Sequence, residues 1–146
     1  MGIAYPASCV LKSLETFQVH LIINEVGEES RLEAAIDADE LVRIASRKLK
    51  DSGITVINDG SVVQAALCLK VVLIEVDSDE NDNPVFVSYQ VRGEILTEVM
   101  FNYKAINAIV ADTSFNGCCE ALFMTRSVTE CCNMVCDYLI RLMKGS

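Results

Sequence analysis

The sequence predicts an α+β domain with two layers: a mostly antiparallel sheet of four to five strands and two helices packed on one of its faces. Two observations predict it. Several segments alternate apolar and polar residues, as half-buried strands do, and two others repeat apolar residues at the three- and four-residue spacing of amphipathic helices. The order of these segments is β-α-β-β-β-β-α, and its run of consecutive strands favours an antiparallel meander with both helices on the same side.

The first two elements are a strand and a helix. Residues 16–26 alternate between apolar and polar side chains and predict a half-buried strand. A helix follows, with basic residues toward its C-terminal end, where the helix dipole favours them. Asp37 or Asp39 is expected to cap this helix, with Glu40 completing a capping box. Gly53 is expected to end it.

The middle of the chain predicts strands. Residues 54–57 form a short one before an Asn-Asp-Gly turn signal. Residues 65–76 are almost continuously apolar, interrupted by Lys70, and predict a central strand covered on both faces. Residues 77–83 form a polar turn.

Two further strands and a helix complete the chain. Residues 85–101 alternate over an unusual length, which predicts a kink or bulge at Gly93. Residues 104–112 return as another strand, and a loop is expected near Asn116 and Gly117. Ser127 is expected to cap the final helix. That helix carries a wide apolar stripe made of Val128, Cys132, Val135, Cys136, Leu139, Leu142 and Met143.

The sequence contains neither an internal repeat nor a linker. At 146 residues, its length is that of one domain. We therefore expect a single α+β domain over residues 16–144, preceded by an N-terminal extension over residues 1–15.

The composition excludes several classes of protein. With 12 Lys and Arg against 21 Asp and Glu, the net charge is −9, which disfavours a nucleic-acid binder. No charge-free apolar run reaches the roughly 18 residues of a membrane span. Hydrophobic residues make up 51% of the chain and the mean hydropathy is +0.33, more than a small globule readily hides. We therefore expect a homodimer or higher oligomer.

Seven cysteines are the most conspicuous candidates for chemistry, and five of them lie within residues 118–136. They allow a zinc site, disulfides or a nucleophile, but there is no Cys-x-x-Cys motif, and the only histidine is His20. The favoured interpretation is that they are small buried apolar residues.

Other candidates are weaker. His20 is expected on the polar face of the first strand, and Glu94 and Glu98 on an exposed strand face. The acidic stretch 77–83 has the residue types that calcium prefers, but it does not fit an EF-hand loop. Residues 79–86 resemble the calcium-binding linker of cadherins, an all-β family that two helices would contradict. We interpret 77–83 as a hairpin turn.

Four features occur together in this chain. A helix ends in the junction Leu-Lys-Asp-Ser-Gly-Ile-Thr-Val at 49–56, and a long hairpin spans 67–76 and 85–101. The strand phrase at 108–117 ends in small polar residues and a glycine, and an amphipathic helix closes the chain. This combination resembles a loose group of small bacterial proteins, often exported, with no assigned function. The resemblance spans residues 16–143, implies the same fold and transfers no catalytic residue.

The sequence thus favours a non-catalytic binding or self-associating domain, most simply a homodimer. The alternatives are a small-ligand binder or enzyme with a cleft between helices and sheet, and an acidic, chaperone-like protein that binds a protein partner. We assign no catalytic, cofactor-binding or metal-ligating residue and expect no cofactor. The expected location is cytoplasmic if the chain is complete, and periplasmic or lipid-anchored if an upstream signal was removed.

Overall fold

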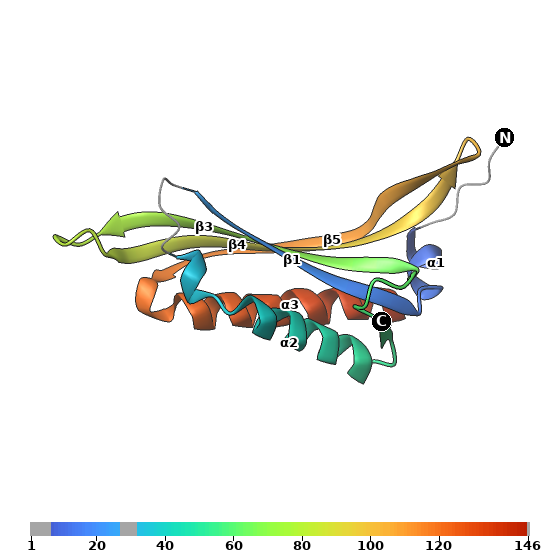
Figure 1. The fold of residues 1–146 in the computed structure, drawn as a ribbon, viewed down its shortest axis with the longest axis horizontal. Coiled ribbons are helices and arrows are strands. Elements are labelled where there is room, and N and C mark those ends of the chain that lie inside the picture. The colour runs from blue at the N-terminus through green and yellow to red at the C-terminus, as the bar shows by residue number, and fades with distance from the viewer. Residues whose placement is uncertain (1–6, 27–31, 146) are drawn as a thin grey trace.

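A five-stranded mixed sheet and two long helices form the two layers of the fold (Figure 1). The computed structural model describes residues 7–26 and 32–145. The sheet runs in the order β2-β1-β3-β4-β5. The strands are β1 (Thr16–Val26), β2 (Thr55–Val56), β3 (Ala65–Ser78), β4 (Pro84–Phe101) and β5 (Lys104–Glu120). The helices are α1 (Ala7–Lys12), α2 (Ala38–Asp51) and α3 (Met124–Lys144), with 3₁₀ turns at Glu33–Ala35 and Ala121–Phe123.

The α+β class predicted from the sequence is confirmed. The long helices α2 and α3 pack on the same face of the sheet, and the antiparallel pairs β3–β4 and β4–β5 form its longest ladders. The strand β1 pairs in parallel with both β2 and β3. A parallel pair needs a crossover connection, which the segment containing α2 provides.

The predicted cap of α2 is confirmed, because the Asp37 carboxylate accepts a hydrogen bond from the Glu40 N–H at 3.1 Å. The predicted cap of the last helix is wrong. The helix α3 begins at Met124, one turn before Ser127, and its N-cap Phe123 makes no side-chain hydrogen bond. The 3₁₀ turn before it leads directly into the helix, and the added turn buries Met124.

Two predictions for the second half of the sheet are also wrong. β5 continues to Glu120, so Asn116 and Gly117 pair with β4 and form no loop. The register shift in the β4–β5 ladder lies between Ile95 and Leu96, where Val110 is the extra residue, and not at Gly93. Gly93 serves close packing, because a Cβ there would lie 2.2 Å from Val135 Cγ1 of α3.

The core lies between the sheet and the helices, on one side of β3 only. Leu67, Leu69, Val71 and Leu73 are at most 1% exposed, whereas their neighbours on the opposite face are half-buried. The prediction that this strand is covered on both faces is therefore wrong. Cys132 and Cys136 are buried in the same core, and the six cysteines whose side chains the structure describes are free thiols. Burial raises the pKa of both core thiols to about 12.

The helix α1 lies in the segment where the sequence predicts no element. It contacts α3 and β5, and Leu11 joins the core at 5% exposed. Within the part of the chain that the structure describes, none of the helices is both long and apolar enough to cross a membrane.

Candidate binding surface: the open face of the sheet

The face of the sheet that points away from α2 and α3 is the candidate functional surface. In the middle of this face, register places one side chain from each of four neighbouring strands in every row. We call it the open face, because no helix that the structure describes packs on it (Figure 1). Its two central rows are His20, Cys68, Glu94 and Asp112, followed by Ile22, Lys70, Arg92 and Ser114.

An ion-pair network occupies the centre of the open face. Lys70 Nζ lies 2.6 Å from Glu94 Oε1, and Arg92 Nε lies 3.5 Å from the same oxygen. Arg92 Nη2 reaches Asp112 Oδ2 at 2.7 Å. Two cations and two carboxylates therefore neutralise one another. The carboxylates of Glu94 and Asp112 are thus engaged by cations of the same chain.

Glu94 lies on the strand face that the sequence predicts, but the prediction that it is exposed there is wrong. Its side chain points to the open face yet is only 3% exposed, while Lys70 and Arg92 are 43% and 42% exposed. Long basic side chains cover apolar and polar surface with their stems while their charged ends stay in water. Glu98, one row further along, is exposed as the sequence predicts.

Exposed apolar side chains lie on both sides of this network. Toward the β3–β4 turn, Val26, Ile74, Val76 and Phe86 are 41% to 59% exposed, and we call these four residues the end patch. Toward the β4–β5 turn, Met100 and Ile109 are 69% and 51% exposed. Exposed apolar side chains that gather in a patch, as the four of the end patch do, are typical of a contact site.

A cavity of about 230 Å³ opens on the same face, beside the network. Its lining includes Gln18, Gln64, Cys68, Leu96, Glu98 and Asn107. Burial, followed by the charge of Glu94, raises the pKa of the Cys68 thiol. A raised pKa keeps this thiol protonated near neutral pH, which makes it a poor nucleophile.

The predicted cleft between helices and sheet corresponds to a hollow of about 340 Å³ beside β1, lined by Ile23, Glu33, Ala34, Ile36 and Ala38. Among the described residues, Glu33 is the one ionisable residue in this lining. General acid–base chemistry needs a side chain with a tuned pKa within hydrogen-bond reach of the substrate. The described part of the lining thus provides a single carboxylate.

The remaining sequence candidates are placed apart from one another. His20 is exposed on the open face, and among the described residues no group of three or more His, Cys, Asp or Glu side chains is arranged to hold a metal ion. The acidic stretch is a hairpin turn, as interpreted from the sequence. The Asp79 carboxylate accepts hydrogen bonds from the Asn81 and Asn83 N–H groups, both at 2.9 Å, and the bonds from Asn83 foremost lower its pKa.

Sequence reasoning missed the ion-pair network, although the chain carries a signal for it. Folding the β3–β4 hairpin about Asn81 places Lys70 opposite Arg92 and Cys68 opposite Glu94, as the structure has them. Two cations directly opposite one another are unfavourable, so they indicate a neighbouring carboxylate that both can contact, and Glu94 lies on the same face diagonally beside Lys70.

No family model and no curated protein matches this chain. Among solved structures it is similar to the rare lipoprotein B of Shewanella oneidensis, with 12% identity, a TM-score of 0.42, and 88% of this chain and 94% of that chain covered. It is also similar to PelC of Paraburkholderia phytofirmans, solved as a dodecamer, with 15% identity, a TM-score of 0.47, and 88% and 87% covered.

A third similar structure is a minor lipoprotein of Acinetobacter baumannii, with 9% identity, a TM-score of 0.40, and 90% of this chain and 92% of that chain covered. These similarities agree with the loose resemblance to small bacterial proteins and include no close match. They assign no role to any residue of this chain.

Proposed function

We propose that this chain is a non-catalytic binding domain that associates with a second copy of itself through the open face of the sheet. The observation that carries the proposal is the exposure of apolar side chains at both ends of a sheet face against which no described helix packs. Removing such side chains from water stabilises a complex by about 25 cal/mol per Å² of apolar area buried.

The centre of the open face supports this proposal, because its charges are already paired. A face with unpaired buried charges would have to desolvate them on association, which costs several kcal/mol per ion. Here the Glu94 side chain is already buried within the single chain. Its cationic partners lie on the open face, which would meet the second copy. Contact would still desolvate the partly exposed Lys70, Arg92 and Asp112, and their ion pairs offset part of that cost.

A second candidate function is binding of a small polar molecule in the cavity beside Cys68. The side-chain amides of Gln18 and Asn107 line this cavity and can both donate and accept hydrogen bonds. Gln64 also lines it, but its Oε1 already accepts hydrogen bonds from the Glu15 and Thr16 N–H groups. Titration of a panel of sugars and amino acids, monitored through the melting temperature, tests this candidate. A concentration-dependent rise that Gln18→Leu abolishes supports it, and no rise with any member of the panel counts against it.

Self-association is tested by light scattering coupled to size-exclusion chromatography over a range of concentrations. We expect the mass to rise above the 16.0 kDa of one chain as the concentration increases. Ile22→Glu, on the open face, should lower the associated fraction, whereas Met134→Glu, an equally exposed position on α3, should not. A mass of one chain at every concentration would overturn the proposal.

The sign of the salt effect is an independent check. Each chain carries a net charge of −9, so two copies repel one another at long range. Salt screens this repulsion and leaves apolar contact intact. Association should therefore strengthen between low and moderate ionic strength.

A further inference from the structure

A two-stranded ribbon extends from one end of the sheet. The β3–β4 ladder ends where Ala65 pairs with Thr97, so residues 98–107 of β4 and β5 pair only with one another. We call residues 98–107 the arm. Four residues per strand give it a length of about 14 Å before the turn. The arm rises away from the helices (Figure 1). A two-stranded ribbon is marginally stable alone in water, and a partner would stabilise it.

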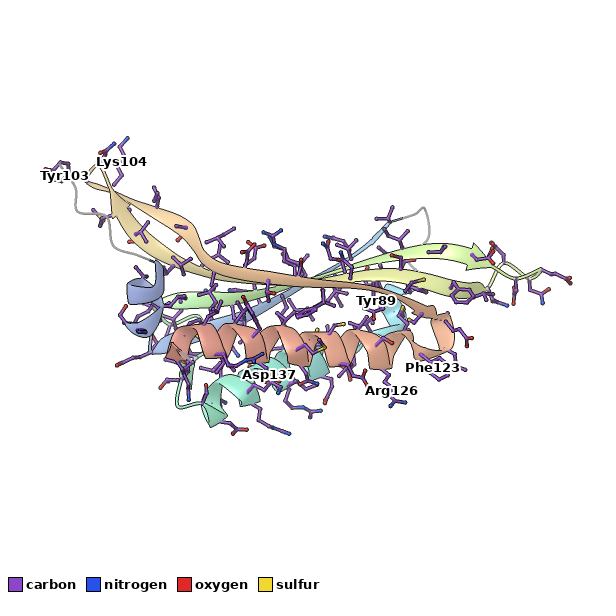
Figure 2. All side chains as sticks on the ribbon, turned by 180° about the vertical axis from the view of Figure 1, so that it is seen from behind. Tyr89, Tyr103, Lys104, Phe123, Arg126 and Asp137 are labelled. Carbon is purple, nitrogen blue, oxygen red and sulfur yellow. The ribbon has the colours of Figure 1, made fainter. Side chains whose placement is uncertain are left out.

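The tip of the arm has an unusual conformation. Asn102 and Tyr103 form its turn with φ angles of +49° and +65°, a region that bulky side chains rarely adopt. Tyr103 is 99% exposed (Figure 2). An aromatic side chain here both strains the turn and displays a large apolar surface, which is what a contact residue does.

The end patch lies at the opposite end of the open face. Val26 and Ile74 are register partners, and Phe86 lies diagonally beside Ile74 on the neighbouring strand. The patch borders the acidic turn, which carries Asp77, Asp79, Glu80 and Asp82. The arm tip carries Lys104 next to Tyr103. The two ends of the face are therefore complementary: an apolar and basic tip at one, an apolar and acidic patch at the other.

Building on the self-association proposed above, we propose that two copies pack open face to open face with their strands running in opposite directions, so that the arm of each lies on the end patch of the other. The twofold axis that relates them lies between the two sheets and crosses the strands between the two central rows. It places β4 and β5 of one copy over β4 and β5 of the other, so the arm meets the end patch on its Phe86 side. The interface is isologous, since each copy contributes the same surface.

This arrangement also matches charges at the centre of the interface. An axis between the two central rows places the row of Glu94 and Asp112 opposite the row of Lys70 and Arg92 of the second copy. A parallel arrangement of the strands would instead bring the row of Lys70 and Arg92 against the same row of the second copy. The charge pattern therefore selects the antiparallel arrangement over the parallel one.

Two variants test the arm and the patch separately. Tyr103→Gly removes the aromatic ring and relieves the positive-φ strain, so the chain should fold at least as stably as the unmodified protein. Ile74→Lys with Phe86→Lys places charges on the end patch. Each variant should raise the dissociation constant of the dimer by at least about tenfold, because the twofold symmetry removes the contact at both places where it occurs.

Mixing the two variants gives the decisive measurement. A heterodimer retains one intact contact, between the arm of the patch variant and the patch of the arm variant. Native mass spectrometry should therefore show heterodimer at concentrations where each variant alone is monomeric. Met134→Lys, which changes exposed apolar surface on α3, should leave the dimer unchanged.

Three outcomes would overturn the arm-on-patch contact while leaving self-association in place. In the first, the unmodified protein associates and both variants associate with the same dissociation constant. In the second, the mixture of the two variants contains no heterodimer. In the third, the protein forms a closed assembly of three or more chains. Protein that stays at one chain mass would instead overturn the proposed function itself. Partition of the monomer onto lipid vesicles through Tyr103 would assign the tip to a membrane surface and likewise overturn the dimer.

Discussion

The two faces of this sheet are shielded from water in different ways. On the covered face, apolar side chains such as Leu69, Val91 and Ile95 are fully buried beneath α2 and α3. On the open face of the same strands, Lys70, Arg92 and Glu94 form a network that shields the sheet with charged side chains. Strands can thus carry a long apolar run without having both faces covered by helices.

The two faces should differ in how well they tolerate amino-acid substitutions. A close-packed face has no space for added atoms, whereas side chains on an open face can move into water. Substitutions on the covered face should therefore alter stability, and those on the open face should alter association more than stability.

The largest effect is expected from Gly93→Ala. The added Cβ would lie 2.2 Å from Val135 Cγ1 and 2.9 Å from Leu139 Cδ1, and both side chains are buried in α3. Overpacking of this kind should lower the free energy of unfolding by about 3 kcal/mol, measured by urea denaturation.

Gly117→Ala is the matched control for Gly93→Ala. Its Cβ would approach the far end of the half-buried Tyr89 ring at 2.3 Å, and this ring can shift. The expected cost is about 1 kcal/mol or less. Equal losses for the two alanine variants would contradict the contrast between a closed helix interface and a sheet margin.

An intermediate effect is expected from alkaline pH, which acts on the covered face. The pKa values of Cys132 and Cys136 rise from 9.0 to about 12 on folding, mainly through burial. The neutral thiols favour the folded state at every pH below 9, and this contribution is lost as the pH rises from 9 toward 12. The melting temperature should therefore fall across that range.

A variant with Cys132→Ala and Cys136→Ala should show a shallower fall in melting temperature between pH 9 and pH 11. Cys118→Ala removes an exposed thiol and serves as the control. Curves of identical slope for the unmodified protein and the double variant would show that these two thiols do not contribute.

Smaller losses of stability than that of Gly93→Ala are expected on the open face. Glu94→Gln removes the shared carboxylate of Lys70 and Arg92, but both cations are partly exposed and can turn to water. We expect a loss of about 1–2 kcal/mol, the cost of a hydrogen bond to a charged group. Ile22→Ala, at a 47% exposed position in the next row, should cost less than about 0.5 kcal/mol. A Glu94→Gln loss as large as that of Gly93→Ala would show that the network is part of the core.

The sequence predicts the elements well where a local rule governs them. The cap at Asp37 and the β1 alternation follow from hydrogen bonding and side-chain period within a few residues. The sequence predicts the structure less well where contact with a distant segment determines the local conformation. The close approach of α3 explains Gly93, and nothing in the alternation of β4 distinguishes such a contact from a bulge.

The bulge at Val110 shows why the candidate surface could be predicted only in part. Before the bulge, the arm follows the register of its two-residue turn, with Leu96 opposite Ile109. The extra residue then reverses which face each later β5 side chain occupies, so Asp112 joins Arg92 on the open face. If the register of the turn is extended along β5 without the bulge, Asp112 is placed opposite Gly93, on the core face.

The parallel pairing of β1 with β3 has a consequence for how the chain reaches this structure. The β3–β4–β5 meander closes through short turns, whereas β1 reaches β3 only after the whole segment between Val26 and Ala65 has been brought back. Loop-closure entropy makes the local hairpins the faster contacts to form and β1 docking the slower one. Until β1 docks, the chain therefore exposes the edge of β3, the most apolar strand, and this interval is when nascent chains are most prone to aggregate.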